Sequence, residues 1–125
     1  MHILLADHHP QALWALKTML SEKPGFAISG EATNAEDLLA QAIVHSPDLV
    51  LMDGDLPGLL VEDTIARLHA YIPRPIIVVM GSKPETRRML LQAGADAFIS
   101  KSDQPDWLLG TLQKFESRIS PVKDA

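Results

Sequence analysis

Short apolar runs alternate with longer amphipathic stretches along the chain. Five runs rich in Val, Ile and Leu stand at residues 3–6, 26–30, 48–53, 76–80 and 97–100. Continuous apolar runs of this length are typical of parallel strands that helices cover on both faces. Each run is followed by a stretch in which apolar residues recur three and four positions apart, as they do in amphipathic helices. The pattern predicts five consecutive β-α units in an α/β domain.

Several of the predicted helices have recognisable start and stop signals. Asn34 and Ser82 are candidate N-caps, because short polar side chains accept hydrogen bonds from the free N–H groups of a first turn. Pro10 and Pro84 suit first turns, and Gly94 suits a C-terminal stop. We expect helices at about residues 10–22, 35–45, 60–70, 83–93 and 105–119.

Composition narrows the class of protein. The 125 residues include 11 Lys and Arg against 16 Asp and Glu, and 46% of them are hydrophobic. We expect one folded domain at 1–119, with 120–125 as a tail or the start of a linker. The acidic balance argues against direct nucleic-acid binding, and the lack of cysteine excludes disulfides and thiol catalysis. Apolar runs too short for a bilayer and a start without a signal peptide's basic segment predict a soluble, cytoplasmic protein with no membrane contact.

Three of the predicted strands end on charged residues. Asp7 follows the first strand, Asp53 ends the third, and Lys101 follows the fifth. In an open parallel sheet the ligand crevice lies beyond the carboxyl ends of the strands, where the strand order reverses. We therefore expect two carboxylates and one ammonium group to meet at this edge of the sheet.

At these positions the sequence resembles the receiver domain of bacterial two-component response regulators. Four blocks carry the resemblance in order, Ile3–Pro10, Leu49–Gly58, Pro75–Val79 and Ala93–Lys101. The resemblance covers residues 1–119 and implies a flavodoxin-like (βα)5 fold, doubly wound, with a five-stranded parallel sheet and helices on both faces. It also implies a signalling domain, and not an enzyme with a small-molecule substrate.

The resemblance implies a phosphorylation site. Asp53, four residues before Pro57, would take a phosphoryl group from a histidine kinase, and Lys101 would bind that group. Such a transfer needs the negative oxygens of both partners to be neutralised. The family does this with Mg²⁺ as well as the lysine, and Asp7, Asp53 and the backbone carbonyl of Asp55 match its metal ligands.

Two positions depart from the family pattern. His8 replaces the usual second acid, and imidazole is a poor partner for the hard Mg²⁺ ion. Met80 stands where the family has a Ser or Thr that donates a hydrogen bond to the phosphoryl group, which a thioether cannot do. Ser82 is an alternative donor, and Gly81 still offers a backbone N–H. The departures put both Mg²⁺ binding and the phosphoryl site in doubt.

The family's switch would be affected too. Phe98 holds the position of an aromatic residue that turns inward when the Ser or Thr moves toward the phosphoryl group. Because Met80 replaces that hydroxyl, Phe98 is either a switch residue or simply part of the core.

His8 allows three further interpretations. The simplest is a histidine that faces solvent in a loop with His9. A protonated imidazole between Asp7 and Asp53 would instead be attracted by both carboxylates and would substitute for the metal. Alternatively, Asp7, His8 and Asp53 would bind a transition metal, since imidazole with carboxylates suits Mn²⁺, Fe²⁺ or Zn²⁺ better than Mg²⁺.

Two tryptophans suggest a surface for partners. Trp14 lies opposite the apolar stripe of the first helix, and Trp107 lies at the edge of the stripe of the fifth. Large aromatic residues are enriched at interfaces. We expect a histidine kinase or other phosphodonor, an output domain or partner protein, and a homodimer through helices one and five or through the face of helix four, strand five and helix five. The simpler interpretation is a singly exposed Trp14 and a Trp107 at the edge of the core.

Other classes fit less well. Asp53-Gly54-Asp55 resembles the D-x-D motif of haloacid dehalogenase-type phosphatases, but that motif ends the first strand and here it ends the third. A flavodoxin-like cofactor binder would need a phosphate-binding loop after the first strand, where Asp7–Pro10 stands. The main alternative is a phosphorylation-independent pseudo-receiver that acts as an interaction or dimerisation module.

Overall fold

A five-stranded parallel sheet forms the middle layer of the domain. The computed structural model describes residues 1–103 and 105–119, so the expected tail at 120–125 lies outside the described residues. The strands are β1 His2–Ala6, β2 Ala27–Ala32, β3 Leu49–Asp53, β4 Ile76–Gly81 and β5 Ala97–Ser100. Their order is β2-β1-β3-β4-β5. The order reverses at β1, as the predicted doubly wound α/β fold requires.

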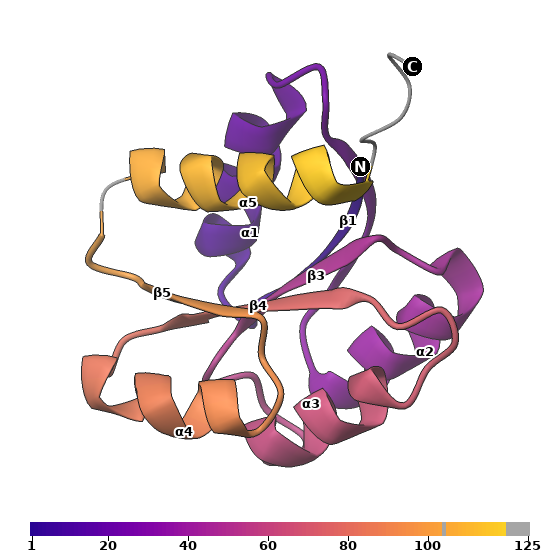
Figure 1. The fold of residues 1–125 in the computed structure, drawn as a ribbon, viewed down its shortest axis with the longest axis vertical. Coiled ribbons are helices and arrows are strands. Elements are labelled where there is room, and N and C mark those ends of the chain that lie inside the picture. Colours follow the sequence, from indigo (N-terminus) through magenta and orange to yellow (C-terminus); the bar gives the residue numbers. More distant parts are fainter. Residues whose placement is uncertain (104, 120–125) are drawn as a thin grey trace.

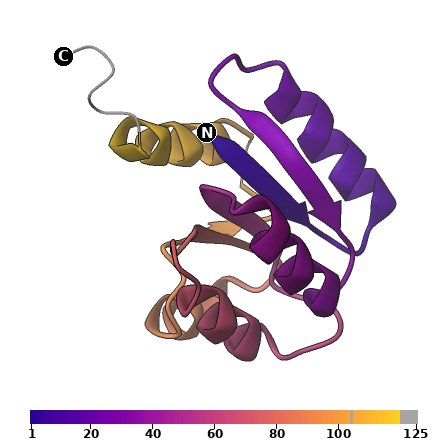
Figure 2. The same cartoon turned by 90° about the vertical axis from the view of Figure 1, so that its right-hand side faces the viewer.

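Helices cover both faces of this sheet. α1 and α5 lie on one face, and α2, α3 and α4 lie on the other (Figure 1). Figure 2 shows the same layers after a quarter turn. The bounds are α1 Pro10–Ser21, α2 Ala35–His45, α3 Val61–His69, the short 3-10 helix η1 Pro84–Thr86, α4 Arg87–Gln92 and α5 Pro105–Ile119. None of the helices in the described part of the chain has the length and apolar content to cross a bilayer.

The strands divide their side chains between two hydrophobic clusters. Leu4, Val50 and Ile77 belong to the cluster on the α2-α3-α4 face, while their strand neighbours Ile3 and Leu49 belong to the cluster on the α1-α5 face. Successive side chains of a strand point to opposite faces, so a strand that is covered on both sides is apolar throughout. This double burial explains the continuous apolar runs of the sequence.

Local signals fix the ends of α2 and α4. The Asn34 side chain accepts a hydrogen bond of 2.8 Å from the backbone N–H of Asp37, which confirms the predicted cap of α2. Gly94 has a φ of 118°, in the region that favours glycine, directly after the turn that ends α4. The predicted stop at Gly94 is also confirmed.

The predicted cap at Ser82 is wrong. Pro84 opens η1 directly after Lys83, and no described side chain caps this turn. Ser82 instead donates its hydroxyl to Asp55 Oδ2 at 3.3 Å. Ser82 therefore connects the loop after β4 to the loop after β3. α4 has six residues and is shorter than the predicted helix.

Candidate functional site

The charged residues at the strand ends meet at one edge of the sheet, as predicted. Ala6 pairs with Met52, so the ends of β1 and β3 are adjacent and Asp7 lies beside Asp53. Both carboxylates are buried, with 3% and 1% of their surfaces exposed. Lys101 Nζ lies 3.0 Å from Asp53 Oδ1 and 3.6 Å from Asp7 Oδ2. One ammonium group thus contacts both buried carboxylates.

Two opposing effects act on Lys101. Partial burial favours the neutral amine and lowers its pKa, but the hydrogen bond and charge of Asp53, followed by the charge and hydrogen bond of Asp7, outweigh it. The net effect raises the pKa of Lys101 above its ordinary value of 10.5. Lys101 is therefore positively charged at neutral pH and is a permanent counter-ion for Asp7 and Asp53.

Two adjacent histidines contact the remaining carboxylate oxygens. His8 Nδ1 lies 3.1 Å from Asp53 Oδ2, and His9 Nδ1 lies 2.9 Å from Asp7 Oδ1. His9 Nδ1 is also 3.9 Å from Asp53 Oδ2. The ring centroids are 3.8 Å apart. Each carboxylate therefore has one oxygen near Lys101 and the other near an imidazole.

The placement of His8 differs in part from the hypothesis of an imidazole between both carboxylates. The described contacts of His8 join it to Asp53, and it is His9 that joins Asp7. Sequence reasoning missed His9 as a site residue. A signal existed, because Asp side chains often accept a hydrogen bond from the backbone two residues on, and His9 N donates to Asp7 Oδ1 at 2.9 Å.

The four residues Asp7, His8, His9 and Asp53 offer ligand atoms that lie within 4.8 Å of one another. The set comprises two carboxylate oxygens and two imidazole nitrogens. Mg²⁺ prefers oxygen ligands, whereas imidazole suits Zn²⁺, Cu²⁺, Fe²⁺ and Ni²⁺. The chemistry of this donor set therefore differs from an all-oxygen magnesium site.

Asp55 supports the site from the following loop. Its backbone N–H donates to Asp53 Oδ1 at 3.0 Å, so this oxygen receives bonds from both Asp55 and Lys101. Its own carboxylate accepts the Ser82 hydroxyl. The described hydrogen bond of Ser82 thus goes to Asp55, and the structure does not bring Ser82 onto Asp53.

Met80 pairs with Asp53 across β3 and β4. Its carbonyl accepts the Gly54 N–H at 2.8 Å. Its side chain packs with the cluster on the α1-α5 face and lines a cavity of about 220 Å³ together with Leu16, Leu108 and Lys101. The Met80 side chain is therefore partly buried against this apolar cluster.

Phe98 lies on the other face of the sheet. It pairs with Val79 and packs, half-buried, against the α2-α3-α4 cluster. A Cβ atom built on Gly81 would lie 2.5 Å from Phe98 Cε2. The missing side chain of Gly81 therefore makes the room that the aromatic ring occupies.

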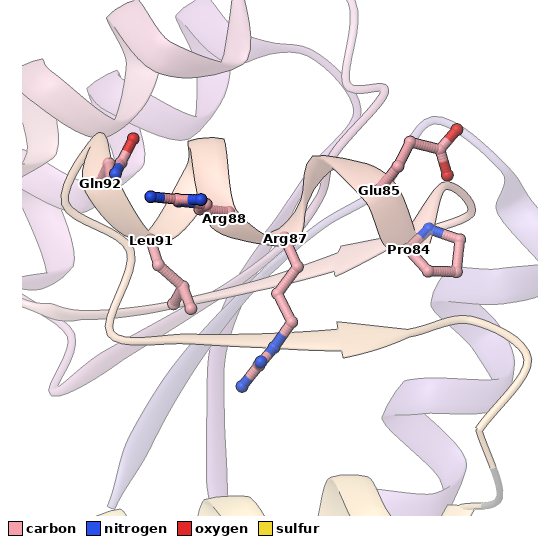
Figure 3. A pocket seen from close by; sticks show the side chains of 6 residues that line it. All are labelled: Pro84, Glu85, Arg87, Arg88, Leu91 and Gln92. Carbon is pink, nitrogen blue, oxygen red and sulfur yellow. The ribbon is translucent and has the colours of Figure 1, made fainter.

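A separate hollow of about 560 Å³ lies on η1 and α4, away from the charged strand ends. It is lined by Pro84, Glu85, Arg87, Arg88, Leu91 and Gln92. Figure 3 shows the side chains of Arg87 and Arg88 extending from α4 in different directions. The hollow shares no lining residue with the cluster at Asp53, so it belongs to the outer surface of this helix.

A comparison with known protein families identifies the family of this chain. A family model for the response regulator receiver domain matches residues 3–113. This chain belongs to the response regulator receiver domain family.

Several response regulators are similar to this chain. It is 31% identical over 114 residues to the nitrate/nitrite response regulator protein NarL of Escherichia coli K12, covering 90% of this chain and 53% of NarL. It is 34% identical over 103 residues to the virulence factors putative positive transcription regulator BvgA of Bordetella pertussis, covering 81% of this chain and 49% of BvgA. The chain spans about half the length of these relatives.

Solved structures agree on the fold. A two-component response regulator of the LuxR family from Aurantimonas sp. superimposes with a TM-score of 0.86 at 23% identity, over 94% of this chain and 85% of that one. The signal receiver domain of the putative response regulator NarL from Mycobacterium tuberculosis gives a TM-score of 0.85 at 21% identity, over 93% and 95% of the two chains.

Proposed function

We propose that Asp53 accepts a phosphoryl group from a histidine kinase or another phosphodonor. The supporting observation is that the carboxylate of Asp53 is buried at the end of β3 and that Lys101 Nζ lies 3.0 Å from its Oδ1 atom. The Asp55 N–H holds the same oxygen. Asp53 Oδ2 is then the oxygen that attacks phosphorus. A new O–P bond forms, the bond to the donor breaks, and the donor leaves with its electron pair and takes up a proton.

The chain's own residues would stabilise this transfer electrostatically. Lys101 is charged at neutral pH and contacts Asp53 Oδ1, the partner of the Oδ2 atom that would carry the phosphoryl group. Fixed positive groups aimed at developing negative charge supply much of the catalysis in such transfers. The chain would act as a signalling domain in the cytoplasm and not as an enzyme that turns over a small-molecule substrate.

We further propose that His8 weakens the family's Mg²⁺ site. Its Nδ1 lies 3.1 Å from Asp53 Oδ2, on the carboxylate oxygen that Lys101 leaves free. A nitrogen donor in this position is a poor replacement for an acid toward a hard cation. No step of the proposed transfer is therefore assigned to Mg²⁺; Asp7, Asp53 and the Asp55 carbonyl are the groups that would hold such an ion.

The same contact favours the second candidate, a pseudo-receiver that works without phosphorylation. In that case His8 and Met80 would hold the domain in one state, and the domain would act as an interaction module. The two candidates differ in whether Asp53 can bind the phosphoryl mimic beryllofluoride.

We propose an output domain or a partner protein as the recipient of the signal, since the similar proteins NarL and BvgA are about twice as long and are named as regulators. Two faces are candidates for a homodimer. One carries Trp14 on α1 and Trp107 on α5, each 67% exposed. The other is formed by α4, β5 and α5, and the α4 part includes Arg87 and Arg88 in the lining of its surface hollow.

An amide NMR titration with beryllofluoride tests the proposed phosphoacceptor. We expect shifts near Asp53, Gly81 and Lys101 that extend to Phe98 on β5. The Asp53→Asn variant is the control and should show none of them. A wild-type spectrum that beryllofluoride leaves unchanged, as it does that of Asp53→Asn, would instead support the pseudo-receiver.

A further inference from the structure

We propose that Asp7, His8, His9 and Asp53 bind a divalent transition-metal ion of the Zn²⁺ type. The geometry of the cluster carries the inference, and the proposal does not require Asp53 to carry a phosphoryl group. It extends the sequence-based metal set by one residue, His9, which brings a second nitrogen ligand to the site.

Each of the two carboxylates has one oxygen that Lys101 does not contact. Lys101 contacts Asp53 Oδ1 and Asp7 Oδ2, which leaves Asp53 Oδ2 and Asp7 Oδ1 for the imidazoles. A cation placed among the imidazoles would thus meet one oxygen from each acid. Lys101 would keep the other oxygens and orient both ligands, as outer hydrogen bonds commonly do at metal sites.

The distances suit a small tetrahedral ion. Ligands about 2.0–2.1 Å from Zn²⁺ stand about 3.3 Å apart in a tetrahedron. The corresponding pairs here are 2.9 Å for His9 Nδ1 and Asp7 Oδ1, 3.1 Å for His8 Nδ1 and Asp53 Oδ2, and 3.9 Å for His9 Nδ1 and Asp53 Oδ2. All four ligand atoms lie within 4.8 Å of one another, so small side-chain movements complete the set.

Solvent can reach the cluster from the imidazole side. The side chains of His8 and His9 are 36% and 57% exposed, whereas those of Asp53 and Asp7 are 0% and 4% exposed. An ion would therefore arrive past the histidines and bind above the buried acids. Any proton shared between an imidazole nitrogen and a carboxylate would leave to solvent, so binding would release protons.

Occupation of this site would affect signalling. The ion would bind Asp53 Oδ2, the oxygen that the proposed phosphoryl transfer uses. The metal ion and the phosphoryl group would then compete for Asp53. A bound transition metal would inhibit phosphorylation of Asp53, or it would act on the domain as a second signal at the same site.

Calorimetric titration of the untagged, metal-free chain with ZnCl₂ tests the proposal, with MgCl₂ for comparison and CoCl₂ as a spectroscopic probe. We expect one Zn²⁺ per chain, proton release, visible absorption of a tetrahedral Co²⁺ complex, and much weaker binding of Mg²⁺. The His8→Ala and His9→Ala variants should each weaken Zn²⁺ binding by roughly tenfold or more. Circular dichroism verifies that both variants fold.

Three controls exclude the other histidines. His2 lies next to Met1, His45 lies at the end of α2 and His69 lies at the end of α3. His2→Ala, His45→Ala and His69→Ala should therefore bind Zn²⁺ as wild type does. Equal affinity of His9→Ala and wild type, loss of binding in His2→Ala, or equal affinity for Mg²⁺ and Zn²⁺ would each overturn the proposal.

A restoring variant sharpens the test. His8→Asp returns a carboxylate to the family position and should raise the affinity for Mg²⁺ while lowering that for Zn²⁺. If the chain is phosphorylated at Asp53 but does not bind Zn²⁺, the metal site is overturned and the proposed function stands. If the chain binds Zn²⁺ but never accepts a phosphoryl group, the proposed function is overturned and the metal site stands.

Discussion

His8 Nδ1 lies 3.1 Å from Asp53 Oδ2, on the oxygen of the buried carboxylate that Lys101 does not contact. His8 stands in the loop between β1 and α1, and its side chain is partly exposed. Asp53 therefore has a lysine on one carboxylate oxygen and an imidazole on the other.

Removal of the lysine charge should destabilise the fold. Lys101→Met leaves Asp7 and Asp53 buried without their shared ammonium group, and we expect a loss of roughly 2 kcal/mol in the free energy of unfolding at neutral pH. Urea denaturation measures this loss. An unchanged stability would mean that the two histidines alone compensate the carboxylates.

The lysine also gives stability a dependence on alkaline pH. The folded-state pKa of Lys101 is raised above its ordinary value of 10.5, so its contribution is fully present below about pH 10 and is lost as the pH rises through the folded-state pKa. The stability difference between wild type and Lys101→Met should stay constant from neutrality to about pH 10 and shrink above it. A difference that grows with alkaline pH would contradict this assignment.

Gly81 and Phe98 should be energetically coupled. An added Cβ at position 81 would lie 2.5 Å from the Phe98 ring, so Gly81→Ala should cost about 1–3 kcal/mol through overpacking. In a Phe98→Ala background the same change should cost far less, which a double-mutant cycle measures. Equal costs in both backgrounds would show that the ring does not depend on this space.

Gly110 offers a matched control for this cycle. It lies within α5, and an added Cβ would meet no described atom within 4 Å. Gly110→Ala should therefore stabilise the domain by about 0.5–1 kcal/mol, as the helix propensities of the two residues predict. If Gly110→Ala raises the stability and Gly81→Ala lowers it, the loss at position 81 comes from packing against Phe98 and not from a general effect of replacing glycine by alanine.

The exposed tryptophans test the proposed dimer face. Trp14→Lys and Trp107→Lys should change the stability by less than about 0.5 kcal/mol, because both side chains are 67% exposed. If α1 and α5 form the interface, both variants should sediment as monomers at concentrations where the wild type associates. Unchanged sedimentation would move the search to the face of α4, β5 and α5.

The fold and half of the site follow from the sequence. The apolar runs predict strands buried on both faces. The parallel arrangement brings Asp7, Asp53 and Lys101 together because each stands at the end of a strand or directly after it. The role of His9 does not follow, since the local turn after β1 decides which imidazole meets which carboxylate. Sequence patterns also do not show that Ser82 hydrogen-bonds Asp55 instead of capping a helix.

The surroundings of Phe98 also could not be predicted from the sequence. Phe98 stands three residues before Lys101, and the sequence left open whether it is a switch residue or part of the core. The structure places the ring over Gly81, on the face opposite Met80. This relationship depends on the register of β4 and β5, which short-range patterns do not specify.

Phosphorylation of Asp53 is tested most directly by intact-mass spectrometry after incubation with a small phosphodonor. We predict that the wild type gains one phosphoryl group, that His8→Asp gains it faster in Mg²⁺, and that Asp53→Asn gains none. Labelling of His8→Asp without any labelling of the wild type would contradict the proposed phosphoacceptor and would identify the domain as a pseudo-receiver held inactive by His8.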